Sequence, residues 1–170
     1  TEERLGLLRA MKEADFQAET QTPIGPGTVA DFLSIRIFDA WIHEQDIRRA
    51  VGIAGHLEGP VAVHSVGRVA RAMPFVVGKK AAAPDGATVV FNITGDAGRV
   101  LPVAVEGTRA RLLEEEPSDP TARLTMHAET FACLGCGRWS PGESLVSGKV
   151  ALQGSQELGE RIVNQMNIMI

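Results

Sequence analysis

The sequence predicts an α+β protein in which helices come first and strands with further helices follow. Three observations carry this prediction. Residues 5–77 contain stretches of apolar side chains at helical spacing, residues 88–113 alternate between apolar and polar side chains, and the turn-forming residues 84–86 lie between them. We therefore expect two domains, residues 1–82 and residues 83–170.

The helical part is predicted to contain three helices separated by loops. They span residues 5–15, 28–51 and 61–77. Thr28 can cap the long second helix, with Asp31 three positions on as its capping partner, and Gly52 is expected to end it. Residues 21–27 are rich in proline and glycine, so we predict a loop there. Pro74 is expected to end or kink the third helix.

The second part is predicted to form a sheet accompanied by two helices. Strands are expected over residues 88–94, 101–105, 108–113, 123–126 and 148–152, and helices over residues 127–134 and 155–166. Glu106-Gly107, between two of these strands, is typical of a two-residue hairpin turn. Ser155 is the expected cap of the last helix.

The composition narrows the possible functions. Hydrophobic residues make up 44% and charged residues 22% of the chain, as in ordinary globular proteins. The net charge of −4 argues against a nucleic-acid or anionic-membrane partner, and no uncharged apolar run is long enough to cross a membrane. The only cysteines, Cys133 and Cys136, lack a second ligand pair and are expected to pack inside a short helix. Their number fits a reducing cytosol, so we expect a cytoplasmic protein.

One stripe of ionisable side chains runs along the predicted helix of residues 28–51, which is otherwise apolar around much of its girth. The stripe consists of Arg36, Asp39, His43 and Asp46, which fall within a sector of about 80° on a helical projection. Asp39 and His43 are four residues apart and can share one divalent ion. Asp46 could be a further ligand or could orient the imidazole, and Arg36 could pair with Asp39 or bind an anionic substrate.

The same residues also have a purely structural interpretation. An aspartate and a histidine four residues apart often form a helix-stabilising hydrogen bond or ion pair. Two ligands are also too few for a metal site. The other histidines, His56, His64 and His127, have no placement in the sequence that marks them as ligands. The residues alone leave both interpretations open.

Longer segments resemble a known family. Residues 31–52, DFLSIRIFDAWIHEQDIRRAVG, with GPGT just before them, resemble the metal-binding domain of actinobacterial mycothiol-dependent maleylpyruvate isomerase-family proteins, relatives of the DinB four-helix-bundle superfamily. Residues 131–139, residues 148–154 and Met166-Asn167 resemble the C-terminal domain of the same family, which is related to sterol-carrier-type domains. The resemblance implies part of a DinB-like bundle followed by a small sterol-carrier-like α+β domain with a mainly antiparallel sheet.

The resemblance also implies a site and an activity. Asp39 and His43 would be two of three protein ligands to a divalent metal, usually zinc, although this family's founding isomerase has Glu in place of the Asp. The third ligand, a histidine on an earlier helix, has no counterpart here, so we expect a preceding segment or a second chain to complete the bundle. The implied protein is an enzyme that uses mycothiol or a similar small thiol for isomerisation or for thiol transfer to a small electrophile. Catalytic roles would then fall to Arg36 and Asp46.

A non-catalytic alternative is a protein of the same fold that binds a metal or an apolar ligand. In that case the stripe on the long helix would be a structural network. Neither the substrate nor the identity of the metal follows from the residues.

Overall fold

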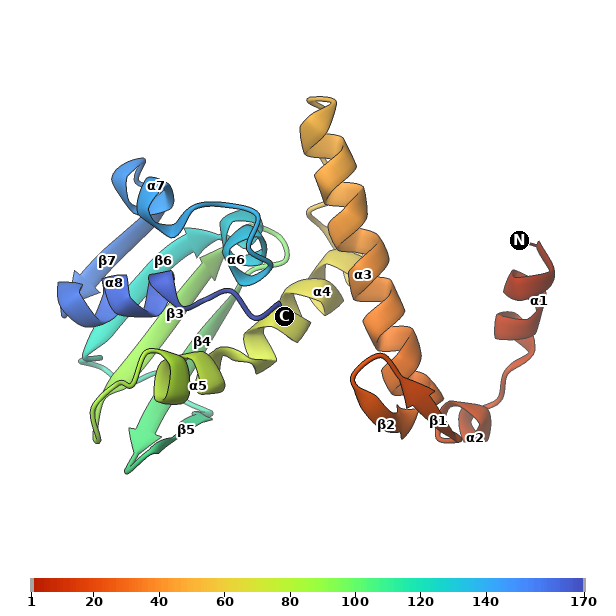
Figure 1. The fold of residues 1–170 in the computed structure, drawn as a ribbon, viewed down its shortest axis with the longest axis horizontal. Coiled ribbons are helices and arrows are strands. Elements are labelled where there is room, and N and C mark those ends of the chain that lie inside the picture. The colour runs from red at the N-terminus through yellow and green to blue at the C-terminus, as the bar shows by residue number, and fades with distance from the viewer. Residues whose placement is uncertain (1, 170) are drawn as a thin grey trace. The chain divides into compact units, whose positions relative to one another are not determined.

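The structure is a computed structural model that describes residues 2–169, and its chain divides into two compact units, Thr1–Ile53 and Ala54–Ile170 (Figure 1). The first unit contains α1 (Glu2–Ala10), α2 (Glu13–Phe16), β1 (Glu19–Thr22), β2 (Gly25–Thr28) and α3 (Val29–Ala50). The second contains the helices α4 (Gly59–Arg71), α5 (Met73–Phe75), α6 (Ala128–Gly135), α7 (Pro141–Val146) and α8 (Gln156–Asn164), and a π-helical turn, Val76–Lys80. Its strands are β3 (Thr88–Thr94), β4 (Arg99–Glu106), β5 (Arg109–Leu112), β6 (Ala122–His127) and β7 (Val150–Gly154).

This division differs from the boundary that we predicted after residue 82. The reason is that the two helices that follow residue 58 contact elements of the second unit: α4 packs against α6, and α5 packs against β5. The predicted interruption by Pro74 is confirmed, because α4 ends at Arg71 and the chain continues as a separate short helix.

Two predictions for the first unit are wrong. Residues 21–27 are not a loop, because β1 and β2 pair as an antiparallel hairpin in which Gln21 lies opposite Pro26. A two-stranded ribbon has only edge strands, so it tolerates a proline that a central strand would not. The single helix predicted over residues 5–15 is two helices, because the backbone N–H of Lys12 donates to the Asp15 carboxylate at 2.7 Å and starts a second helix.

The long helix α3 begins as the sequence predicts. The Thr28 hydroxyl accepts a hydrogen bond from the Asp31 backbone N–H at 3.1 Å, and the Asp31 carboxylate accepts one from the Thr28 N–H at 2.9 Å. This reciprocal pair satisfies two backbone donors that a helix N-terminus leaves without partners. The helix ends at Ala50, and Gly52, two residues later, has a φ of +68° that favours glycine.

The sheet of the second unit has the strand order β5-β4-β3-β6-β7. The two central strands β3 and β6 are parallel, whereas the other three neighbouring pairs are antiparallel. The sheet is therefore mixed, and mainly antiparallel as expected. All five predicted strands are present within one or two residues of their expected ends, but α7 was not predicted.

Helices α6 and α8 pack against the central strands and cover one face of this sheet (Figure 1). The buried side chains of β3 that point to this face include Phe91, whose ring meets the edge of Phe131 from α6 at a centroid distance of 6.2 Å. On the other face Asn92 and Thr125 are half-buried and form a cross-strand hydrogen bond of 3.4 Å. Within residues 2–169, no helix is both long and apolar enough to cross a membrane.

The contact between α4 and α6 should be sensitive to side-chain volume at Gly135. A Cβ atom there would lie 2.4 Å from a methyl carbon of buried Val69. We expect Gly135→Ala to lower the free energy of unfolding by about 1–3 kcal/mol in urea denaturation, because the close-packed helices must move apart. Gly142→Ala in α7 is the matched control, because its added methyl group meets no atom within 4 Å. Equal stability of the two variants would contradict this account of the interface.

The hairpin of β4 and β5 contains an ion pair that changes the pKa of its carboxylate, Glu106. The Arg111 guanidinium donates to the Glu106 carboxylate at 2.6 and 3.0 Å, and this hydrogen bonding, with the charge of Arg111, lowers the pKa of Glu106 from its ordinary 4.5. The pair stabilises the fold above the ordinary pKa of Glu106, and this contribution is lost as the pH falls through the lowered value. We expect Arg111→Gln to raise the Glu106 pKa measured by carboxyl NMR titration. Arg123→Gln, which removes a different ion pair, should leave it unchanged.

Candidate functional site

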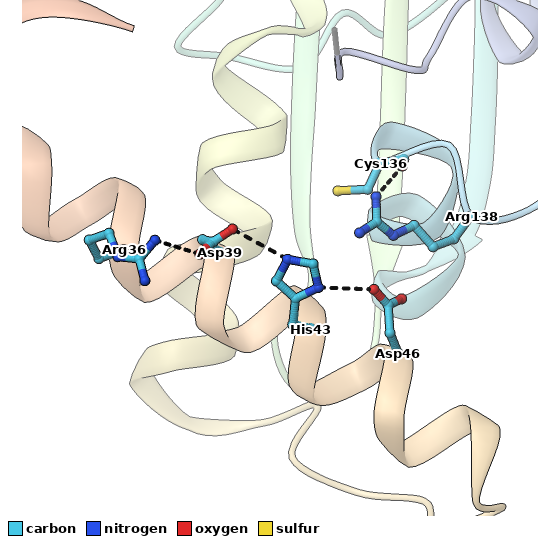
Figure 2. A network of polar contacts seen from close by, with 6 residues as sticks. All are labelled: Arg36, Asp39, His43, Asp46, Cys136 and Arg138. Atoms are coloured by element: carbon cyan, nitrogen blue, oxygen red, sulfur yellow. Dashed lines mark hydrogen bonds and ion pairs between the residues drawn. The ribbon is translucent and has the colours of Figure 1, made fainter. Parts of the chain in front are cut away.

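The four predicted site residues lie along one face of α3 and are brought together in a chain of charge contacts (Figure 2). Arg36 Nη1 donates to Asp39 Oδ2 at 2.8 Å. His43 Nε2 lies 3.5 Å from Asp39 Oδ1, and His43 Nδ1 lies 3.6 Å from Asp46 Oδ2. At the C-terminal end of this chain of contacts, Arg49 Nη2 donates to Asp46 Oδ1 at 2.6 Å. We call these five residues the α3 stripe.

The geometry of the α3 stripe follows from helical spacing alone. Its members are three or four residues apart, so their side chains lie one above another on the helix surface. The side chain of His43 is 64% exposed and that of Arg36 is 57% exposed, whereas Trp41 and Ile42 on the same helix are buried. The predicted separation of a polar stripe from apolar faces is therefore confirmed.

The central imidazole has a carboxylate beside each of its ring nitrogens. Both nitrogen–oxygen distances are longer than a normal hydrogen bond, while each carboxylate makes a short contact with an arginine. Asp39 and Asp46 are thus held in place by Arg36 and Arg49. The imidazole is left between two ordered negative charges.

The donor types of this arrangement suit a divalent ion such as zinc, which binds imidazole nitrogen and carboxylate oxygen. One ring nitrogen and Asp39 can face the ion, while Asp46 faces the other nitrogen, as the carboxylate partner of a metal-bound histidine does. Within the described part of the chain, however, no group of three or more His, Cys, Asp or Glu side chains is placed to hold a metal ion. The α3 stripe therefore fits a contribution of two ligands.

The other histidines and cysteines have different surroundings. His56 lies in the segment between α3 and α4 with a φ of +58°, and His64 is on α4. His127 caps α6, since its Nδ1 accepts from the backbone N–H of Glu129 at 3.2 Å. Cys133 and Cys136 are buried thiols at α6 and its C-terminal cap, as the sequence predicts for small residues packed in a short helix.

A cavity in the second unit was not predicted from the sequence. It has a volume of about 270 Å³ and lies between α4 and strands β4 and β5. Two of its lining residues are arginines, Arg71 and Arg99, which are 28 residues apart in the sequence and share no motif. The small Gly67 within a helix is the one local signal for it, because a glycine inside a helix often marks a close approach.

Known proteins that are similar to this chain include one family with a matching model and several distantly similar solved structures. The family model described as MDMPI C-terminal domain matches residues 50–161. No curated protein matches the chain. The family match agrees with the resemblance noted for the second half of the sequence. The DinB-like bundle predicted for the first half stays a prediction.

Three solved structures illustrate the distant similarities. A UbiJ-SCP2 ubiquinone synthesis protein is 13% identical, with a TM-score of 0.46 over 63% of this chain and 96% of its own. Sterol Carrier Protein 2 Like 2 from Aedes aegypti is 17% identical, with a TM-score of 0.45 over 58% of this chain and 93% of its own. Sterol Carrier Protein 2 from Yarrowia lipolytica is 18% identical, with a TM-score of 0.41 over 62% and 93%.

The family model covers well over half of the sequence, including every strand of the mixed sheet. The chain therefore belongs to the MDMPI C-terminal domain family.

Proposed function

We propose that this chain is part of a metal-dependent enzyme that uses a low-molecular-weight thiol, such as mycothiol, to isomerise a small electrophile or to transfer the thiol to it. Asp39 and His43 would hold a divalent ion, for which zinc is the best match by ligand type. The observation that carries the proposal is the exposed His43 imidazole with a carboxylate facing each ring nitrogen. Membership of the MDMPI C-terminal domain family supports the isomerase part of the proposal, although the matched residues begin after the α3 site residues.

Four residues of the α3 stripe have distinct parts in this proposal. Asp39 and His43 supply the ligand atoms, and Asp46 orients the imidazole from its other nitrogen. Arg36 fixes the Asp39 carboxylate and, being 57% exposed, is available to anchor an anionic group of the substrate. The bound ion would supply Lewis acidity, which favours the thiolate form of a thiol. The remaining ligand would come from outside the described residues, for example from a second chain.

The first test measures zinc binding by the 170-residue protein with calorimetric titration and elemental analysis. We expect Asp39→Ala and His43→Ala each to weaken Zn²⁺ binding about tenfold or more, because each removes an ion ligand. His64→Ala and Cys133→Ala are matched controls, since both remove a potential ligand outside the α3 stripe and should leave the affinity unchanged. Zinc affinity that is equal in the original protein and in all four variants would overturn the assignment of Asp39 and His43 as ligands.

The second test separates Asp46 from the ligands. We expect Asp46→Asn to weaken Zn²⁺ binding about tenfold to a hundredfold, because a histidine ligand depends on the carboxylate that orients it. Nitrogen NMR of His43 in the zinc-free protein should show a changed tautomer balance in this variant, because Asp46 faces Nδ1 of the imidazole. An unchanged tautomer balance would remove Asp46 from this role.

A non-catalytic role has one observation in its favour. The Asp39 and Asp46 carboxylates already contact Arg36 and Arg49 at 2.8 and 2.6 Å, as they would in a network that only stabilises the helix. In that case His43→Ala would lower the stability of α3 and have no effect on metal or thiol binding. The zinc titration distinguishes the two functions directly.

A further inference from the structure

The cavity in the second unit has two kinds of wall. Its α4 wall includes Val63, Gly67 and Arg71, which are spaced by four residues and therefore share one helix face. Its sheet wall includes Arg99 and Leu101, which alternate along β4 and so point to the same face. Further apolar surface comes from Ala70 and Leu112. The cavity is thus basic on one part of its lining and apolar on the rest.

The Arg99 side chain is held firmly against α4. Its Nη2 donates to the Val63 carbonyl oxygen at 3.0 Å, and a Cβ at position 67 would lie only 3.1 Å from Nη1. A side chain at position 67 would therefore push the guanidinium outward by a few tenths of an ångström. Arg99 Nε is buried and has no hydrogen-bond partner among residues 2–169. A buried donor without a partner is costly to the fold.

The charges at the cavity are not balanced by protein carboxylates. Among the described residues, none that lines it is acidic, and His64 lines it together with the two arginines. Other arginines form ion pairs, as Arg111 does with Glu106 and Arg123 does with Glu116. Neither Arg71 nor Arg99 forms such a pair with a carboxylate of the described residues. Two guanidinium groups lining one small cavity favour an anion, because guanidinium matches the geometry of carboxylate and phosphate oxygens.

We propose that this cavity binds a small organic carboxylate with a short apolar tail. Arg71 and Arg99 would hold the carboxylate, and Val63, Ala70, Leu101 and Leu112 would pack against the tail. The volume of about 270 Å³ lies below the range of about 300–1,000 Å³ that is typical for drug-sized ligands, so the ligand is small. The apolar wall favours an organic acid over inorganic phosphate. This site is in the second unit and does not depend on the α3 stripe.

Hexanoate is a suitable probe, with binding followed by two-dimensional NMR and calorimetry on the 170-residue protein. We expect saturable binding whose shift changes map to α4, β4 and β5. Acetate lacks the tail and hexan-1-ol lacks the charge. We expect each of them, and inorganic phosphate, to bind at least about tenfold more weakly than hexanoate. Hexan-1-ol or phosphate binding as tightly as hexanoate would overturn the proposal, as would the absence of saturation.

Arginine variants test the assigned contacts. Arg71 is exposed, so Arg71→Gln should fold normally and weaken hexanoate binding about tenfold through loss of a charged hydrogen bond. Arg109→Gln on β5 is the matched control, because this exposed arginine does not line the cavity. Gly67→Ala should also weaken binding, because its methyl group displaces the Arg99 guanidinium. Equal affinities of Arg71→Gln and Arg109→Gln would overturn the assignment, whether or not Gly67→Ala folds.

Discussion

The close approach of α4 and α6 is the constraint on which the second unit depends. Gly135 leaves no room for a side chain against Val69, and its carbonyl oxygen also accepts a hydrogen bond from the Ile168 backbone N–H at 2.9 Å. Through Phe131, α6 packs on the central strand β3. The position of α4 along the sheet is therefore set by α6. That position in turn brings Gly67 beside Arg99 and creates the basic cavity.

The α3 stripe depends on a different kind of constraint, which is local. Five side chains along one helix face alternate between nitrogen-bearing groups and carboxylates, and each contacts a neighbour three or four residues away. Such a ladder needs no tertiary contact to form. The same alternation stabilises the helix and presents an imidazole and carboxylates to a divalent ion, so structural and metal-binding roles share one geometry.

The α3 stripe and the basic cavity also differ in whether the family model includes their residues. The family model begins at residue 50, so it includes α4 and the sheet but not Asp39, His43 or Asp46. Membership of the MDMPI C-terminal domain family therefore describes the second unit, and the metal proposal depends on the chemistry of α3 itself. The carboxylate cavity lies wholly inside the matched residues.

The sequence by itself determined the elements that depend on short-range spacing. These are the five strands, the Thr28 cap of α3, the interruption at Pro74 and the α3 stripe, because each is fixed by residues a few positions apart. Only the tertiary structure decided the parallel pairing of β3 with β6, the packing of α4 with α6, and the placement of Arg71 and Arg99 around one cavity. Those features join residues that are distant in sequence, where spacing carries no signal and packing volume makes the choice.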